Sequence, residues 1–209
     1  MGSAAIRVLC VDDHLIVRGG IALIISQQSD MSVVALAGTG EEAVLQYRRH
    51  RPDITLMDLR LEGMSGLDAI REIRREAPDA RIIALTMYQG DEDIHQALAA
   101  GAATYLLKNA LTDDLIRVVR EVHAGGRPLL ANVKARLDER ATQPKLTPRE
   151  IQVLELIAQG KRNKEVAEIL GISVDTVPNH MKGIFLKLGV NERTAAVNVA
   201  LRRGIVHID

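Results

Sequence analysis

The stretch VLCVDD, residues 8–13, places the adjacent acidic residues Asp12 and Asp13 directly after a short apolar run. Two later apolar runs also end in a charged residue, because ITLMD ends in Asp58 and TYLLK ends in Lys108. If these runs are neighbouring parallel strands, their carboxyl ends meet at one edge of a sheet, where open α/β sheets bind ligands. Carboxylates gathered there repel one another and require a cation. The pattern therefore predicts a site for Mg²⁺, which prefers oxygen ligands and often acts together with phosphate groups.

The 209-residue chain has an ordinary globular composition, with 47% hydrophobic residues. Its single cysteine, Cys10, lies within an apolar run, so the chain cannot form an internal disulfide and the thiol is expected to be buried. No apolar stretch of the sequence approaches the roughly 20 residues needed to cross a bilayer, and the N-terminus lacks the features of a secretory signal. We therefore expect a cytoplasmic protein that does not engage a membrane.

Charge is distributed unevenly, although the formal net charge is zero. Residues 1–130 contain 14 Lys and Arg against 18 Asp and Glu, whereas residues 131–209 contain 13 against 9. A basic C-terminal segment is compatible with nucleic-acid binding, and an acidic N-terminal segment is not typical of a DNA binder. Solvated surface charge alone can produce a difference of this size, so it carries little weight by itself.

The N-terminal part alternates short β-rich runs with helical patterns, which predicts βαβ units and a parallel sheet. We predict a doubly wound α/β domain with five parallel strands over residues 1–127. Its expected strands are residues 6–12, 32–37, 53–58, 81–86 and 104–107. Its expected helices are residues 14–27, 41–50, 66–77, 91–100 and 112–124.

The pattern weakens after this domain, and we place a linker at residues 128–145, within which residues 131–139 could start as a helix. The remaining segment, residues 146–209, is expected to be all-α. Thr147-Pro148-Arg149-Glu150 combines an N-cap hydroxyl, a proline at the first helical position and a capping-box glutamate, which predicts a helix ending near Gly160. Three further helices are expected at residues 163–170, from a cap at Ser173 to before Gly189, and at residues 191–203.

With a threonine at the end of the fourth predicted strand, five functional side chains stand at strand ends, and residues 5–125 resemble a response-regulator receiver domain with its flavodoxin-like fold. The resemblance implies that Asp58 is the phosphoacceptor. It also implies that Asp58 holds Mg²⁺ together with Asp12, Asp13 and the backbone carbonyl of Arg60. Metal-assisted phosphoryl transfer to a carboxylate agrees with the chemistry expected from the acidic cluster.

The same resemblance assigns the residues that sense phosphorylation. Thr86 corresponds to the switch hydroxyl, Lys108 to the amine that contacts the phosphoryl group, and Tyr105 to the switch aromatic that would follow Thr86 inward. Taken singly, such residues are more often helix caps, solvated side chains or core residues. The prediction therefore rests on the joint pattern and not on any one position.

Two residues near the predicted site need separate comment. Receivers of this type usually carry proline four residues after the acceptor, and here that position is Glu62. An extra acid there removes no catalytic group, but it is expected to loosen the loop or to weaken binding of the phosphodonor. His14 adjoins the acidic pair, and we interpret it as the first residue of a helix and not as a metal ligand.

Residues 146–197 resemble the LuxR-type helix-turn-helix of NarL-like regulators, through the LTPRE opening, the NKEVAEILGIS turn and the KLGVNERTAAV close. The third helix of this segment carries an apolar stripe with helical spacing, namely Val177, Met181, Ile184 and Leu188. Its opposite face holds Asp175, Asn179 and Lys182, with Thr176 at the edge. These side chains are expected to reach base edges and phosphates in a major groove.

The family usually has a basic residue at the position of Pro178, so this chain is expected to lose about one phosphate contact there. Proline inside a helix can cost up to ~3 kcal/mol unless a kink or a 3₁₀ first turn relieves it. Other expected phosphate contacts are Lys161, Arg162, Lys164, Lys187 and Arg193. In the family the last helix pairs two copies on DNA, which implies a dimer surface at Ala195, Val199 and Leu201.

The sequence therefore predicts a two-component response regulator. A sensor histidine kinase would phosphorylate Asp58, and the phosphorylated chain would form a homodimer that binds double-stranded DNA and controls transcription. The chain would not be an enzyme, beyond assisting its own Mg²⁺-dependent phosphorylation and dephosphorylation. Two alternatives remain: a sequestering regulator that binds protein partners and reads DNA weakly, which Pro178 keeps open, and a metal-dependent phosphatase or transferase acting on an external substrate.

Overall fold

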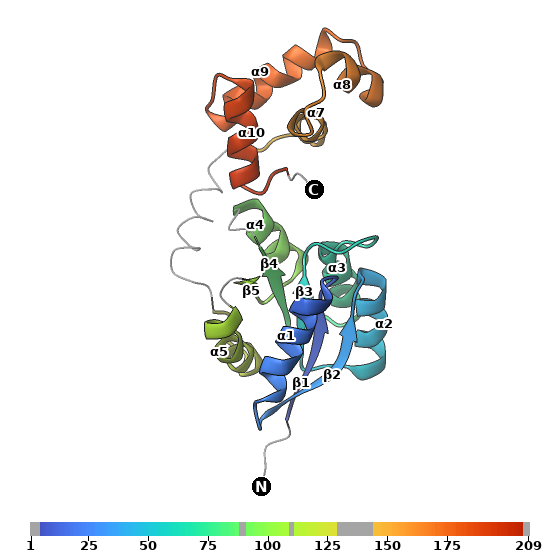
Figure 1. The fold of residues 1–209 in the computed structure, drawn as a ribbon, viewed down its shortest axis with the longest axis vertical. Coiled ribbons are helices and arrows are strands. Elements are labelled where there is room, and N and C mark those ends of the chain that lie inside the picture. The colour runs from blue at the N-terminus through green and yellow to red at the C-terminus, as the bar shows by residue number, and fades with distance from the viewer. Residues whose placement is uncertain (1–4, 88–90, 109–110, 129–143, 207–209) are drawn as a thin grey trace. The chain divides into compact units, whose positions relative to one another are not determined.

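The computed structural model describes residues 5–87, 91–108, 111–128 and 144–206 of the chain (Figure 1). The chain divides into two compact units, of which one comprises residues 1–87 and 94–130 and the other residues 88–93 and 131–209. Apart from its ends, the expected linker at residues 128–145 lies outside the described residues, as does the helix considered at 131–139.

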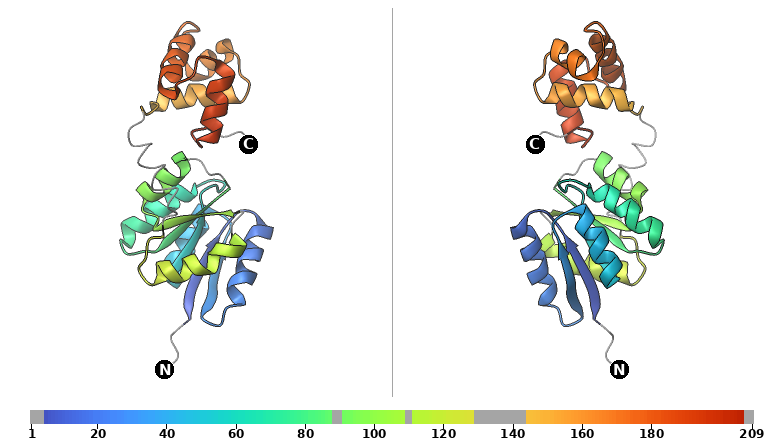
Figure 2. Two further views of the ribbon diagram at one scale, coloured as in Figure 1. Left: turned by 90° about the vertical axis from the view of Figure 1, so that its left-hand side faces the viewer. Right: turned by 90° about the vertical axis from the view of Figure 1, so that its right-hand side faces the viewer.

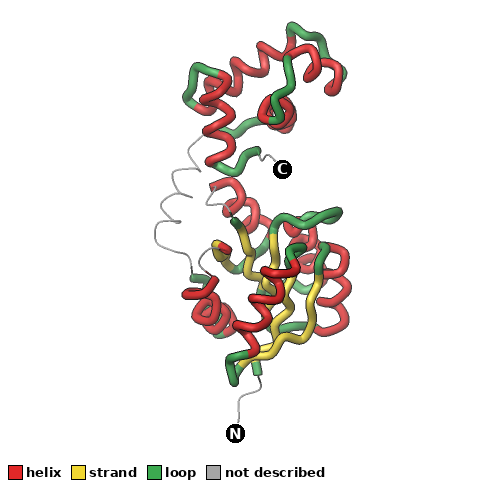
Figure 3. Tube along the Cα trace, viewed as in Figure 1, coloured by secondary structure: helices red, strands yellow, loops and turns green. Residues whose placement is uncertain are grey.

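Within its described residues, the N-terminal unit contains a five-stranded parallel sheet in the order β2-β1-β3-β4-β5 (Figures 1 and 3). The strands are β1 (Ile6–Val11), β2 (Met31–Ala37), β3 (Ile54–Asp58), β4 (Ile82–Thr86) and β5 (Thr104–Leu107). The helices are α1 (Leu15–Ser26), α2 (Gly40–His50), α3 (Gly66–Glu76), α4 (Asp91–Ala100) and α5 (Leu111–His123). The predicted doubly wound α/β fold is confirmed, and each element lies within one residue of its expected bounds.

Helices cover both faces of the sheet. Helices α1 and α5 pack on one face, and α2 and α3 lie side by side on the other (Figure 2). All residues of β3 and β4 are buried, which explains why these strands are continuous apolar runs and do not alternate with polar residues. Each fully buried Leu or Ile side chain contributes about 1.5–3 kcal/mol, so this double-sided burial is the main stabilising term of the unit.

Polar caps fix where α2 and α3 begin. Thr39 Oγ1 accepts a hydrogen bond from the Glu42 N–H at 3.2 Å, and Ser65 Oγ accepts one from the Asp68 N–H at 3.2 Å. Each cap satisfies an N–H group that has no partner within the helix, and such a cap is worth about 1 kcal/mol. Because Thr39 is the cap, α2 begins at Gly40, one residue before its expected start.

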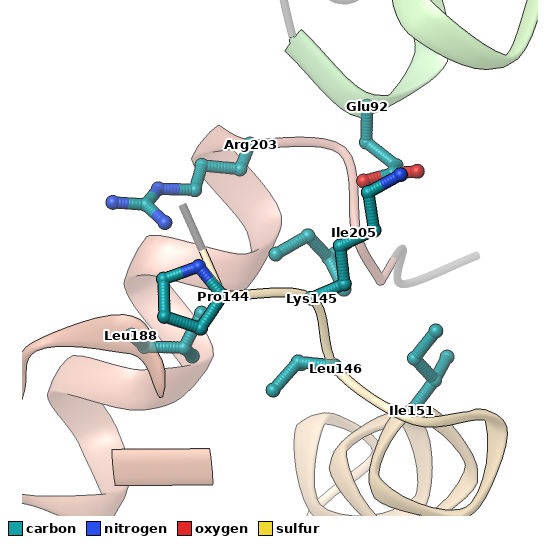
Figure 4. Close-up of a pocket in the computed structure, with 8 residues that line it drawn as sticks. All are labelled: Glu92, Pro144, Lys145, Leu146, Ile151, Leu188, Arg203 and Ile205. Atoms are coloured by element: carbon teal, nitrogen blue, oxygen red, sulfur yellow. The ribbon is translucent and has the colours of Figure 1, made fainter. Parts of the chain in front are cut away.

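The C-terminal unit is helical, as predicted. Its helices are α7 (Pro148–Ala158), α8 (Asn163–Leu170), α9 (Thr176–Leu188) and α10 (Arg193–Arg202). The predicted capping box at the start of α7 is present, with Thr147 Oγ1 accepting from the Glu150 N–H and Glu150 Oε2 accepting from the Thr147 N–H at 2.6 Å. Leu146 and Ile205 pack against the core of the unit, to which Leu188 of α9 belongs (Figure 4).

The start of α9 differs from the sequence prediction. Ser173 was expected to cap this helix, but the helix begins at Thr176 and Asp175 occupies the N-cap position in an αR conformation. Before it the chain makes two i to i+3 hydrogen bonds, from the Thr176 N–H to the Ser173 carbonyl at 3.0 Å and from the Val177 N–H to the Val174 carbonyl at 3.3 Å. A tight 3₁₀-like turn therefore replaces the expected first turn of α-helix.

None of the helices in the described residues is long and apolar enough to cross a membrane.

Burial of Cys10 leads to a prediction about its reactivity. Cys10 is fully buried in β1, and this burial raises the pKa of its thiol to about 12. Since the thiolate is the reactive form, we expect the folded chain to show essentially no reaction with a colorimetric disulfide reagent at pH 8, and one thiol per chain after denaturation. Rapid modification without denaturant would show that β1 is not buried in the sheet.

Candidate metal centre and nucleic-acid interface

The carboxyl ends of three strands bring an amine against two carboxylates. Asp12 follows β1, Asp58 ends β3 and Lys108 follows β5, and all three side chains are at most 5% exposed. The Lys108 Nζ atom lies 2.7 Å from Asp12 Oδ2 and 2.7 Å from Asp58 Oδ2. The strand order explains why these side chains meet. The strands are parallel, so they all end at the same edge of the sheet. At that edge β1 is adjacent to β3, and only β4 lies between β3 and β5.

The pKa values of Asp58 and Lys108 are both raised, for different reasons. Burial raises the pKa of Asp58, the nearby Asp12 carboxylate adds to the increase, and Lys108 opposes both. Burial alone would lower the pKa of Lys108, but its contacts with Asp12 and Asp58 outweigh this and raise it. Lys108 is therefore a cation at neutral pH, and it neutralises only part of the acidic charge.

The acidic residues fit a divalent cation. Ligand atoms of Asp12, Asp13, His14 and Asp58 all lie within 4.8 Å of one another. Asp12 Oδ2 is buried and makes no well-aligned hydrogen bond with any described residue, so Lys108 reaches it only as an ion pair. Asp13 is 28% exposed, which leaves the cluster open to solvent on that side. Carboxylate oxygens in this arrangement suit a hard ion such as Mg²⁺.

Backbone contacts hold the loop that follows Asp58. Asp58 Oδ1 accepts a hydrogen bond from the Arg60 N–H at 3.2 Å, and the Met64 N–H donates to Glu41 Oε1 at 3.0 Å. Gly66 packs so tightly that an added Cβ atom would lie 1.8 Å from the Asp58 carbonyl oxygen. The loosening of this loop expected from Glu62 is therefore opposed by the hydrogen bond between Met64 and Glu41. The sequence carried no signal for this role of Glu41 beyond its place in the first turn of α2.

The predicted switch residues are both buried. Thr86 ends β4 and is 4% exposed, and Tyr105 lies in β5 and is 5% exposed. The strand register pairs Thr86 with Leu107 and Ala84 with Tyr105, so the hydroxyl and the aromatic ring belong to adjacent strands. Tyr105 was expected to move inward on switching, and it is already buried in this structure.

His14 was interpreted as a helix-initiating residue, and it is the N-cap residue of α1. Its backbone N–H donates to Asp12 Oδ1 at 2.9 Å. The contact of its ring with the acidic cluster was not predicted: His14 Nδ1 lies 2.6 Å from Asp13 Oδ1. Its position directly after the two aspartates was the signal that could have indicated this contact.

In the C-terminal unit, α9 has the two faces that the sequence predicted. The apolar stripe is buried, at Val177, Met181, Ile184 and Leu188. On the opposite face Pro178, Asn179 and Lys182 are exposed, and Thr176 is half-buried. The helix that follows the Gly171 turn therefore presents polar groups to solvent where a helix-turn-helix contacts DNA.

Pro178 fits α9 with little strain because the helix begins later than expected. It is the third residue of the helix, where the backbone N–H would have no partner within the helix in any case. The Val174 carbonyl, which a proline at this position would crowd, accepts its hydrogen bond from the Val177 N–H instead. The 3₁₀ relief considered from the sequence is thus what the structure shows.

Two of the six basic residues expected at phosphates make contacts inside the unit. Lys187 forms an ion pair with Glu150 Oε2 at 2.6 Å, and Arg193 donates to Asn163 Oδ1 at 2.9 Å and to the Lys161 carbonyl. The remaining candidates are Lys161, Arg162, Lys164 and Lys182, of which the last three are exposed. In α10, Ala195, Val199 and Leu201 are half-buried.

Comparison with known proteins agrees with both units. Residues 8–120 match the response regulator receiver domain family, and residues 144–200 match the family described as bacterial regulatory proteins, luxR family. The chain is 38% identical over 210 residues to the transcriptional regulatory protein LiaR of Bacillus subtilis, covering 97% of this chain and 100% of LiaR. The chain is a two-component response regulator.

Solved structures of response regulators resemble this one along most of its length. The response regulator ChrA of a heme-sensing two-component system matches with a TM-score of 0.58 and 34% identity, covering 97% of this chain and 100% of ChrA. An RcsB–DNA complex matches with a TM-score of 0.67 and 26% identity, covering 95% of this chain and 98% of RcsB. The family assignment supports transcriptional control and disfavours the phosphatase alternative.

The Glu150 contacts in the regulator predict a pH-dependent stability. Burial alone would raise the pKa of Glu150, but Lys187 and the Thr147 backbone hold it below its usual range. Because the folded-state pKa is lowered, the stabilisation is complete above the unfolded pKa of about 4.3 and is lost as the pH falls through the folded value. We expect Glu150→Gln to lower the free energy of unfolding by about 1–3 kcal/mol at pH 7.

Thermal unfolding of the wild-type and Glu150→Gln regulators between pH 7 and pH 3 measures this effect, and the difference between them should shrink below pH 4. Glu155→Gln is the matched control, since Glu155 is an exposed glutamate of the same helix. A difference that stays constant over the whole pH range would contradict an ion-paired role for Glu150.

Proposed function

We propose that Asp58 accepts a phosphoryl group from a sensor histidine kinase and that this controls DNA binding by the C-terminal unit. The observation that carries the proposal is the buried contact of Lys108 with both Asp12 and Asp58, at 2.7 Å each. A lysine so buried needs charged partners, and a phosphoryl group on Asp58 would provide a stronger one. We further propose residues 1–127 as the receiver domain, 128–145 as the linker and 146–209 as the DNA-binding domain.

The residues of the receiver support each part of the transfer. An Asp58 oxygen attacks the phosphorus of the phosphohistidine, the phosphorus–nitrogen bond breaks, and the departing imidazole takes a proton. Asp12, Asp13, Asp58 and the Arg60 backbone carbonyl would hold Mg²⁺, which when bound neutralises charge on the transferring group. Lys108 contributes a fixed positive charge at the same point, and the Arg60 N–H orients the Asp58 carboxylate.

Phosphorylation would then change the partners of Lys108 and Thr86. The phosphoryl group adds about −1.5 to −2 charge at pH 7 and new acceptor oxygens. Lys108 would exchange part of its contact with Asp12 for the phosphoryl oxygens, and Thr86 would donate to them from the end of β4. These contacts exist only in the phosphorylated chain, so they provide the differential free energy that shifts the regulator toward its active state.

The exposed face of α9 supports sequence-specific DNA reading. Asn179 can donate to and accept from the major-groove edge of adenine, and Lys182 can contact guanine or phosphate. Lys161, Lys164 and Thr176 would contact the DNA backbone. Pro178 lies on the same exposed face of α9 as Asn179 and Lys182. Solved RcsB structures include dimers bound to DNA. By analogy we assign Ala195 and Val199 of α10 to pairing of two phosphorylated copies, which requires two related half-sites.

Pro178 supports a second candidate function, that of a regulator with weak DNA binding. The exposed proline offers no cation and no N–H donor to a phosphate, so the DNA affinity of a single unit is expected to be low. A regulator with weak DNA binding that acts mainly by sequestering a protein partner would use the same receiver. DNA binding that stays weak after phosphorylation would favour this alternative.

Phosphorylation at Asp58 is directly testable by mass. After incubation with acetyl phosphate and Mg²⁺, intact mass spectrometry should show an adduct of about 80 Da on the wild-type chain, and a mobility shift with operator DNA should strengthen. Asp58→Asn should show neither effect. Asp79→Asn, which removes an exposed carboxylate beyond α3, should behave as wild type. An adduct on the folded Asp58→Asn chain would place the acceptor elsewhere.

Adding a cation at position 178 should strengthen DNA binding. We expect Pro178→Lys to steepen the log–log dependence of affinity on salt by about 0.9, because it adds about one phosphate contact. Fluorescence anisotropy with labelled duplex at several salt concentrations measures the slope. Ser29→Lys adds the same charge to an exposed loop of the receiver and should leave the slope unchanged. Equal slopes for Pro178→Lys and wild type would remove residue 178 from the DNA surface.

A further inference from the structure

The exposed face of α9 carries a large apolar side chain at its centre. Leu186 is 84% exposed. It follows Asn179 by seven residues and Lys182 by four, so the three side chains share one face of the helix. This face is opposite the buried stripe that ends at Leu188. Around the helix, Leu186 therefore lies between the two polar side chains that are proposed to read DNA.

Packing within the chain does not account for this leucine. Among the described residues, the core of the C-terminal unit does not include Leu186. A single exposed leucine is common on protein surfaces and needs no explanation by itself. In this unit, however, Val174 in the turn before α9 is 48% exposed and Pro178 is also exposed. Apolar residues therefore lie before and after Asn179 and Lys182 along the surface proposed to contact DNA.

The span from Asn179 to Leu186 suits a helix that lies along a major groove. Side chains at i, i+3, i+4 and i+7 share one face, and a helix in the groove can read bases from these positions. Seven residues of α-helix cover about 10 Å. This length corresponds to about three base-pair steps of duplex DNA. Leu186 can therefore reach base edges about three base pairs away from those that Asn179 would contact.

The chemistry of the major groove restricts what a leucine can recognise there. The C5-methyl group of thymine is the apolar group that base edges offer, and the other groups are hydrogen-bond donors and acceptors. Contact between Leu186 and a polar base edge would remove water from that edge without replacing its hydrogen bonds, which lowers affinity. Contact with a thymine methyl group instead removes apolar surface from water on both sides.

We propose that Leu186 reads the methyl group of a thymine and makes α9 selective for a T·A base pair about three steps from the base that Asn179 contacts. The inference rests on the proposed function in taking the exposed face of α9 as the DNA-reading surface. Leu186 adds base specificity without charge, whereas Lys182 can also contact phosphates, which carry no sequence information.

Uracil, which lacks only the C5-methyl group of thymine, tests this contact directly. A duplex is first selected from a random library by the full-length chain treated with acetyl phosphate and Mg²⁺, and each thymine is then replaced in turn by uracil. One replacement should weaken binding by the wild-type chain about 4-fold, the factor expected for one buried carbon group. The same replacement should not affect Leu186→Ala, which should bind the thymine duplex about 4-fold or more weakly.

Two control variants separate methyl recognition from a general disturbance of the helix. Leu186→Met keeps an apolar side chain of similar volume and should retain the sensitivity to uracil. Leu45→Ala removes a leucine of α2 that is 61% exposed, and it should bind both duplexes as the wild type does. Because leucine contacts no phosphate, the log–log salt dependence should be the same for Leu186→Ala and wild type.

The outcomes separate this inference from the proposed function. A wild-type chain that tolerates uracil at every position would overturn the role of Leu186. An equal loss of affinity in the wild type and Leu186→Ala would overturn it too, as would Leu186→Ala binding the thymine duplex like the wild type. If no duplex can be selected, or if Asn179→Ala and Lys182→Ala bind it as tightly as the wild type, the reading face itself is refuted.

Discussion

The ion pairs of Lys108 with Asp12 and Asp58 are the interaction on which the receiver depends. Two carboxylates buried at one sheet edge would repel each other, and a buried ammonium at 2.7 Å from both makes their coexistence possible. The strand order places the three residues, since β1, β3 and β5 all end at this edge. The sheet is thus a scaffold that holds opposite charges close together in a site that still carries excess negative charge.

A second buried charge organises the C-terminal unit. Glu150 begins α7 through the capping box and also binds Lys187 near the end of α9. Its Oε1 atom lies 2.7 Å from where a Cβ atom of Gly183 would be, so glycine at that position lets the carboxylate reach α9. One side chain therefore sets the start of α7 and the position of α9, the helix that carries the residues proposed to contact DNA.

Much of this architecture could be predicted from the sequence because the signals were local. Continuous apolar runs identified the buried strands, and the Thr147 to Glu150 motif identified the start of α7. The start of α9 was predicted wrongly, since a serine cap and a 3₁₀ turn that leads into a later helix have similar local sequences. Whether a basic residue faces solvent or an internal partner also depends on tertiary contacts, and Arg193 and Lys187 illustrate this.

The proline near the start of α9 has a consequence beyond the missing cation. Its ring fixes one backbone torsion on the exposed face of the helix, so the unfolded chain has fewer conformations to lose and the first turn is preorganised. A surface ordered in advance loses less conformational entropy when a partner docks. In the proposed DNA complex, the regulator would exchange long-range electrostatic attraction for rigidity, which would favour a slower approach to DNA and a better defined fit once contact is made.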